Sequence, residues 1–321
     1  MKTLTQTQFA SAESALWLSA RVLERVRFEC LFQAGPRERV IAALRGYQNL
    51  DGGFGQGIEP DFRGPVSQPL GVDFAFKVLE EIQTPDPAII ESALRFLTRV
   101  TAADGGLPNV LANVAEYPRA PWWVAPTEIR GCLLPTAPIA GLLLAWKVEH
   151  PWLDAAVAYC WPAIDTLMQR AKTATERFPR IQVAYEARAT LPFLDHAPDR
   201  ARAERVAKAL HESLTNAGMI SLEPNPAAEA SLPLDLAAHP NTLARRWFDD
   251  TVIERHLDAL IDSQEKDGGW GVPWLIWTPV TSFEWRGIST LERLKTLRAY
   301  GRLEADSRKY FSGYGGRRSL L

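Results

Sequence analysis

A glycine-rich segment that occurs twice constrains the fold of this 321-residue chain more than any other feature. Residues 48–55 read QNLDGGFG and residues 264–271 read QEKDGGWG. Shorter copies stand at residues 103–107 (ADGGL) and 216–219 (NAGM), so the spacings are 53, 112 and 51 residues. The middle spacing is about two units long, which places a decayed copy near 160–175. A chain of this length then holds six repeats, and we predict two helices in each.

The repeated segment has the chemistry of a helix end. We expect a helix to stop at Gln48, with the Asp51 carboxylate accepting hydrogen bonds from nearby backbone amides. Gly52 or Gly53 then takes the left-handed conformation that terminates a helix. The next aromatic residue, Phe54 here, is expected to fold back and pack against its own unit.

Helical periodicity extends over most of the remaining chain. Prolines stand at or just before several predicted helix starts, where their missing N–H costs nothing, and no alternating run is long enough to propose a sheet. Leu16, Leu23, Val26 and Leu31 predict one N-terminal helix, and Val40, Ala43, Leu44 and Tyr47 predict a second. Further helices are expected at 68–83, 87–100, 133–148, 152–171, 180–194, 199–215, 249–264 and 283–300.

Composition narrows the class of protein. Hydrophobic residues make up 46% of the chain and the formal net charge is -2, which fits a folded globular protein and argues against nucleic acid as a partner. No apolar run is long enough for a membrane span, and the N-terminus lacks the pattern of a secretory signal. Three cysteines, Cys30, Cys132 and Cys160, are too few for a disulfide framework. We therefore expect a cytoplasmic protein and leave its oligomeric state open.

The repeats resemble those of a known family. Gln48-x3-Gly52-x-Phe54 and Gln264-x3-Gly268-x-Trp270 are similar to the QW repeats of squalene and oxidosqualene cyclases and to the DGGFG repeats of protein prenyltransferase β subunits. This resemblance implies an all-α, (α/α)6 toroid with six inner helices around a central cavity. We expect one such domain over residues 1–311 and a flexible tail over 312–321.

Two departures from that resemblance bear on chemistry. Class II cyclases protonate an alkene with a DxDD motif, which this chain lacks; the nearest acids, Asp249 and Asp250, suit a helix start. Prenyltransferases hold a zinc ion, but the histidines and cysteines here show no metal-ligand spacing. We predict no metal and no cofactor, with a zinc held by scattered ligands as the less favoured alternative.

The segment after the first repeat is the first candidate site. It carries Glu59, Asp61, Arg63 and Gln68 among prolines and glycines that restrict its backbone. In a toroid, the segments after the turns converge on one mouth of the cavity, where rigid polar loops suit catalysis. The alternative is a solvated loop in which Arg63 pairs with one of the two acids.

Other turn segments supply further candidates. The long segment 107–130 contains two adjacent tryptophans, and Asp235 and His239 are spaced so that a helical turn would let them share a hydrogen bond. Structural alternatives are a tryptophan staple, surface ion pairs and helix caps. The predicted catalytic residues are Glu59, Asp61, Asp235, His239 and Glu284. The predicted substrate-binding residues are Arg63, Gln68, Trp122, Trp123, Arg130, Tyr185, Trp274, Trp277, Trp285 and Arg286.

These residues are compatible with three functions. The first is an isoprenoid (terpenoid) cyclase-like enzyme, in which aromatic rings stabilise carbocations and a carboxylic acid moves the proton. The second is a carbohydrate-active hydrolase or lyase, with tryptophans stacking on sugar rings and two carboxylates dividing acid and base roles. The third is a non-catalytic binding module. We favour the first, acting on a small-molecule substrate.

Overall fold

The computed structural model describes residues 1–224 and 230–304, which form twelve α-helices and two short 3₁₀ helices. The chain divides into two compact units, one of Gly46–His256 and the other of Met1–Arg45 with the described residues from Leu257 onward. The predicted tail, 312–321, lies outside the described residues. The single domain expected over 1–311 stays a prediction.

The larger unit contains most of the helices. In chain order they are α4 (Pro69–Glu81), α5 (Pro87–Val100), η1 (Ala112–Glu116), α6 (Leu133–Ala145), α7 (Pro151–Thr173), α8 (Arg177–His196), α9 (Arg200–Asn216), α10 (Pro233–Leu236), η2 (Leu243–Trp247) and the first part of α11 (Asp250–Asp262). The smaller unit contains α1 (Gln6–Ser19), α2 (Val22–Phe32), α3 (Arg37–Arg45), α12 (Pro279–Ala299) and the end of α11.

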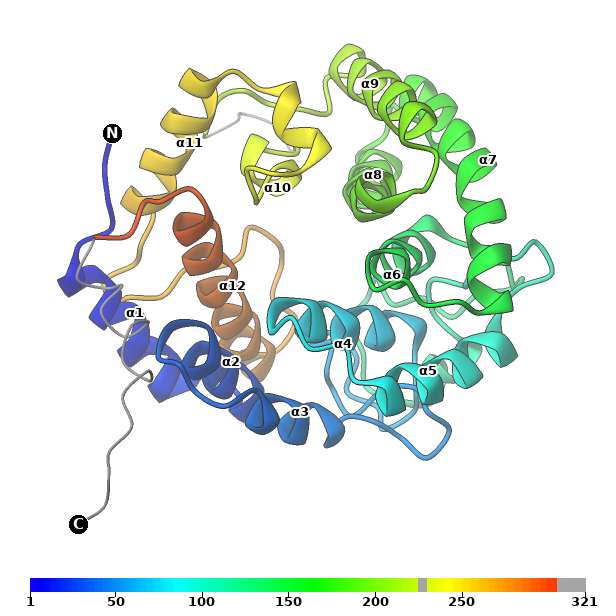
Figure 1. The fold of residues 1–321 in the computed structure, drawn as a ribbon, viewed down its shortest axis with the longest axis horizontal. Coiled ribbons are helices and arrows are strands. Elements are labelled where there is room, and N and C mark those ends of the chain that lie inside the picture. The colour runs from blue at the N-terminus through cyan, green and yellow to red at the C-terminus, as the bar shows by residue number, and fades with distance from the viewer. Residues whose placement is uncertain (225–229, 305–321) are drawn as a thin grey trace. The chain divides into compact units, whose positions relative to one another are not determined.

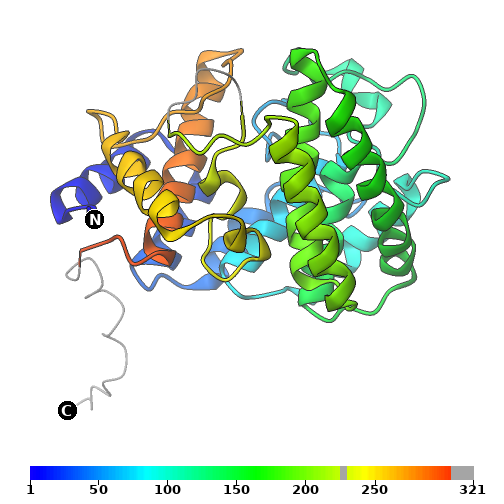
Figure 2. The ribbon, with the colours of Figure 1, turned by 90° about the horizontal axis from the view of Figure 1, so that it is seen from above.

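Helical hairpins build the larger unit in two rows. Figure 1 shows α4, α6, α8 and α10 in an inner row, with α5, α7 and α9 outside them. The helices of residues 151–216, coloured green, run alongside one another in Figure 2. Helix α6 packs against both α4 and α8. At Gly141 a Cβ atom would lie 2.5 Å from the backbone carbonyl of Pro192, so the absent side chain lets α6 and α8 approach closely.

An aromatic cluster and a close helix crossing hold the smaller unit together. The rings of Phe9, Phe28 and Phe32 lie 5.3–5.8 Å apart between α1 and α2. A Cβ on Gly287 of α12 would lie 2.8 Å from the Cβ of Ala20. Ala20 itself has an extended backbone conformation. The single N-terminal helix predicted from the apolar pattern is therefore wrong: the chain breaks between α1 and α2 at this crossing, and both halves bury their apolar residues.

The repeated turns have one backbone geometry. The first glycine of each copy has a positive φ, at 91° for Gly52, 89° for Gly105 and 90° for Gly268. The predicted left-handed glycine is confirmed, but the helix does not stop at Gln48: α3 ends at Arg45, seven residues before Gly52. Because Gly52 adopts the left-handed conformation, the left-handed position is the first glycine of the pair and not Gly53.

The aspartate of each copy joins the turn to the start of the next inner helix. Asp51 accepts a hydrogen bond from the Gly53 amide at 2.9 Å and a second from the Ser67 hydroxyl at 2.7 Å, just before α4. Asp104 likewise accepts a hydrogen bond from the Gly106 amide in its own turn. It accepts a second from the Gly131 amide at 3.0 Å, just before α6. The turn therefore fixes where that helix begins.

Two other parts of the repeat pattern can be located. The connection between α7 and α8 falls at residues 174–176, the end of the interval in which a decayed copy was expected, and it has no Asp-Gly-Gly sequence. Helix α7 is 23 residues long, which displaces this turn from regular spacing. The fifth inner helix, α10, has only four residues.

Candidate functional site

The loop that carries Glu59 and Asp61 lies inside the larger unit. Glu59 is 8% exposed and Asp61 is 5% exposed. One Glu59 oxygen accepts from the Asp61 amide at 2.8 Å, and one Asp61 oxygen accepts from the indole N–H of Trp122 at 3.0 Å. The two acids are therefore buried and fixed, as the prolines of this loop led us to expect, and they do not form a solvated loop.

The long segment 107–130 holds that loop in place. Phe62 stacks on Trp123 with 5.3 Å between ring centroids, and Tyr117 meets the edge of the same Phe62 ring. The backbone adds a bond from the amide of Ala120 to the carbonyl of Asp61 at 2.7 Å. Trp122 and Trp123 thus anchor this segment on the loop that carries Glu59 and Asp61.

The other predicted groups of this region have different surroundings. The Gln68 amide is engaged at both ends, donating to Asn113 at 2.7 Å and accepting from the Leu111 amide at 2.9 Å. Arg63 is exposed, and its guanidinium lies against Gly57. Arg130 forms a surface ion pair with Glu128 at 2.5 Å. Gln68 and Arg130 therefore have structural partners.

The hydrogen bond expected between Asp235 and His239 is not formed. Asp235 accepts from the Leu232 amide at 2.9 Å, whereas the His239 ring accepts from the Asn241 amide at 3.2 Å. The prediction required a helical turn over both residues. Helix α10 ends at Leu236, so the four-residue spacing no longer places the two side chains on one face.

The segment after the last repeat, which contains Trp274, Trp277, Trp285, Glu284 and Arg286, belongs to the smaller unit. Trp274 meets Trp285 edge to face at 5.0 Å, and the indole N–H of Trp277 is buried with no hydrogen-bond partner among the described residues. Arg286 binds the Asp267 carboxylate at 2.6 Å and so secures the last repeat turn. Glu284 is half-buried at the start of α12. Because it lies in this unit, the structure does not place it beside Glu59 and Asp61.

Sequence reasoning missed the most unusual acid of the larger unit, Asp73 on α4. It is 3% exposed, and its Oδ1 atom is buried without a hydrogen-bond partner in the described part of the chain. The Oδ2 atom accepts from Lys77, one turn along the helix, at 2.6 Å. A signal was present, because Asp73 is the only charged residue in the apolar run from residue 69 to 76. A buried polar atom without a partner is costly and often marks function.

Burial controls the ionisation of Asp73. Desolvation raises the pKa of this carboxyl, and the charge and hydrogen bond of Lys77 and the charge of Arg188 oppose that rise without cancelling it. At a given pH, a larger fraction of Asp73 is therefore protonated than of an ordinary aspartic acid. The proton would reside on Oδ1, because Oδ2 is already bound to an ammonium group.

Glu186 and Arg188 lie on opposite sides of α8. Glu186 on α8 pairs with Arg170 of the outer helix α7 at 2.8 Å. Arg188 comes two residues later, so its side chain projects about 200° round α8 from Glu186, on the side away from α7. The charge of Arg188 acts on Asp73 and lowers its pKa in part.

Aromatic rings accompany the cations on these two helices. Lys77 lies over the ring of Phe74 at 6.0 Å, and Arg188 lies over Tyr185, a predicted substrate-binding residue, at 5.1 Å. Tyr185 is 37% exposed. A buried acid with aromatic faces nearby can transfer a proton and stabilise a developing positive charge.

Two features are absent from residues 1–224 and 230–304. No group of three or more His, Cys, Asp or Glu side chains there is arranged to hold a metal ion. No helix of these residues is both long and apolar enough to cross a bilayer.

Similarity to known proteins lies in the fold. No protein-family profile and no curated protein matches this sequence. A crystal structure of a protein from Actinoplanes is 16% identical with a TM-score of 0.55, covering 91% of this chain and 90% of its own. The type II terpene cyclase MstE from Scytonema is 13% identical with a TM-score of 0.51, covering 92% of this chain and 89% of its own. The chain has a terpene-cyclase-like fold. The predicted class, an all-α (α/α)6 toroid, is confirmed at the level of fold.

Proposed function

We propose that this protein is an isoprenoid cyclase-like enzyme in which the carboxyl group of Asp73 is the acid. The observation that carries the proposal is the buried, unpartnered Oδ1 atom of Asp73. Its raised pKa supports a proton on that atom. The fold shared with a type II terpene cyclase makes a small apolar substrate the natural one for such an acid.

The proposed reaction begins with protonation of a carbon–carbon double bond. The O–H bond of Asp73 breaks, a C–H bond forms, and a carbocation and an Asp73 carboxylate result. A second double bond of the substrate attacks the cation and closes a ring, and loss of a proton from carbon ends the reaction. The product is an isomer of the substrate, so no cofactor is consumed.

Side chains near Asp73 have supporting roles in this proposal. Lys77 holds Oδ2, which keeps the carboxyl in one orientation and stabilises the carboxylate after proton transfer. The ring faces of Phe74 and Tyr185 attract positive charge through their quadrupoles. Glu59 and Asp61 remain candidate acid–base groups beside an aromatic cluster. Asp235, His239 and Glu284 stay predictions.

The test is turnover of acyclic isoprenoids. We would incubate the protein with farnesol, geranylgeraniol, squalene and the two prenyl diphosphates, and identify cyclised isomers by gas chromatography and mass spectrometry. Asp73→Asn should lower the rate by about 100-fold or more, the usual contribution of a general acid. Glu59→Gln and Asp61→Asn test the remaining acids in the same assay.

The matched control is Asp165→Asn, which removes an exposed carboxylate from α7. It should leave turnover unchanged. Full activity in Asp73→Asn would overturn the assignment of the acid. Cleavage of oligosaccharides by a chain that forms no isoprenoid product would favour a carbohydrate-active enzyme instead.

A further inference from the structure

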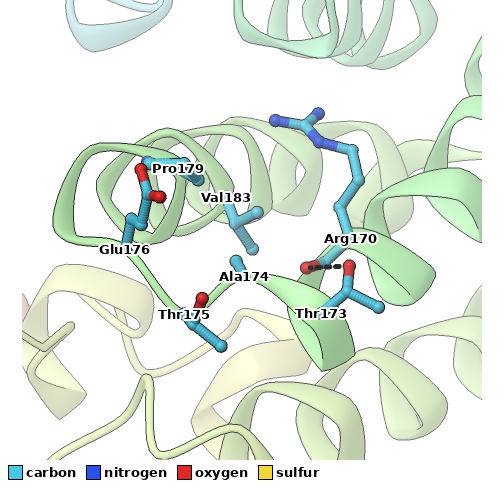
Figure 3. Close-up of a pocket in the computed structure, with 7 residues that line it drawn as sticks. All are labelled: Arg170, Thr173, Ala174, Thr175, Glu176, Pro179 and Val183. Atoms are coloured by element: carbon cyan, nitrogen blue, oxygen red, sulfur yellow. Dashed lines mark hydrogen bonds between the residues drawn. The ribbon is translucent and has the colours of Figure 1, made fainter.

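A pocket of about 350 Å³ lies between the end of α7 and the start of α8, apart from Asp73 and the acidic loop. Ala174 and Pro179 are partly exposed and form its apolar floor, and Val183, which also lines it, is fully buried. Figure 3 shows Arg170 on one side of this floor and Glu176 on the other, with Val183 between them. Its volume falls at the lower end of the range for small-molecule sites.

The charged groups of this pocket have unused hydrogen-bonding capacity. Arg170 donates through Nη1 to Glu186 at 2.8 Å, and its Nε and Nη2 groups have no acceptor among the described residues. The side chain of Glu176 makes no hydrogen bond or ion pair in that same part of the chain, and does not cap α8. The hydroxyl of Thr175, beside it, is likewise without a partner there. A ligand can therefore bind here without displacing a protein contact.

The arrangement has opposite charges on the two sides of an apolar floor. A lone anion would meet the repulsion of Glu176, and a lone cation would meet that of Arg170. A molecule that carries both charges on adjacent carbons satisfies both. We propose that this pocket binds a small apolar α-amino acid, with its carboxylate on Arg170, its ammonium group on Glu176 and its side chain over Ala174 and Pro179. This inference is independent of the cyclase proposal.

The experiment is calorimetric titration of the full chain with L-valine and its two singly charged analogues. Isovalerate lacks the ammonium group of valine and isobutylamine lacks the carboxylate, while the branched apolar part is kept. Valine should bind about 10-fold or more tightly than either analogue, because each lost contact is a charge-assisted hydrogen bond. Equal affinity for either analogue would overturn the zwitterion assignment, as would the absence of valine binding.

Variants separate the two charges. Glu176→Gln should weaken valine by about 10-fold because the ammonium contact is lost, and should not weaken isovalerate, because the repulsion of the carboxylate is removed as well. Arg170→Met should also weaken valine, because the carboxylate contact is lost, and should not weaken isobutylamine. Ala174→Phe should fill the pocket and abolish valine binding.

Exposed residues on nearby helices serve as controls, namely Glu212→Gln for the acid and Lys172→Met for the base. Both control variants should bind valine like the parent. A valine affinity that falls equally in the Glu212→Gln control and in Glu176→Gln would contradict the site. Circular dichroism checks that each variant is folded.

Discussion

The first and last repeats have the same turn but differ in the segment after it. In both, a glutamine side chain donates to the carbonyl of the left-handed glycine, at 3.1 Å from Gln48 and 2.8 Å from Gln264. In the segment after the first turn, the buried carboxylate of Asp61 accepts the indole N–H of Trp122, which comes from segment 107–130. After the last turn, the indole N–H of Trp277 is buried and has no hydrogen-bond partner among the described residues.

This difference shows that the turn is the constant part of the repeat and that the segment after the turn is the variable part. The turn is held by local bonds that each copy supplies for itself, so its sequence pattern persists. The segments after the turns bond to other parts of the fold, and their chemistry is free to diverge. Burying the indole N–H of Trp277 without an acceptor costs free energy, and the structure of the turn does not account for that cost.

The largest effect is expected from glycine substitution in the first turn. Gly52→Ala places a Cβ 2.0 Å from the carbonyl oxygen of Ser92 at a φ of 91°, so backbone must move. We expect a loss of about 3 kcal/mol or more in the free energy of unfolding. Gly105→Ala, with 3.3 Å to the oxygen of Ala155, should cost about 1 kcal/mol. Chemical denaturation measures both, and equal losses would show that the copies do not differ in packing.

The two tryptophans give the next largest difference. Trp122→Phe removes a hydrogen bond to the buried Asp61 and should destabilise the protein by about 1–2 kcal/mol more than Trp277→Phe, which breaks no bond. Both substitutions remove the same volume, so each is the control for the other. The comparison fails if thermal melts of the two variants coincide.

The pH dependence of stability tests the burial of Asp73. The native carboxyl has a raised pKa, so it binds its proton more tightly than the unfolded chain does. Its contribution is therefore full below the ordinary value near 3.8 and is lost as the pH rises through the native pKa. Asp73→Asn should gain stability relative to the parent as the pH rises from 4 toward neutrality. A constant difference across that range would show that Asp73 titrates like an exposed aspartate.

The smallest effect is expected at the surface. Glu128→Gln breaks the exposed ion pair with Arg130. Solvent screens such pairs, so the free energy of unfolding should change by about 0.5 kcal/mol or less. A loss above about 1 kcal/mol would mean that this part of segment 107–130 supports the fold as firmly as Trp122 does.

The parts of the fold that were predictable are those with local causes. The Asp-Gly-Gly turns and the proline-marked helix starts result from contacts within a few residues, so sequence suffices for them. The break at Ala20 was missed because it depends on α12, more than 250 residues away. Asp235 and His239 were paired on the assumption of a helix that ends at Leu236.

The candidate site was predicted only in part for the same reason. The burial of Glu59 and Asp61 agreed with the proline-restricted loop that holds them. The unpartnered oxygen of Asp73 depends on helix packing around α4, which periodicity alone does not specify. The placement of Arg170 and Glu176 on two sides of one pocket likewise results from how α7 meets α8.

Deuterium incorporation tests the proposed acid most directly. The protein would be equilibrated in D₂O and given the acyclic isoprenoid that it converts best, and the cyclised product would be analysed by mass spectrometry and NMR. We predict one deuterium on the carbon that is protonated first, and loss of labelled product in Asp73→Asn but not in Asp165→Asn. A cyclised product without deuterium, or equal labelled product from Asp73→Asn, would contradict the assignment of Asp73 as the acid.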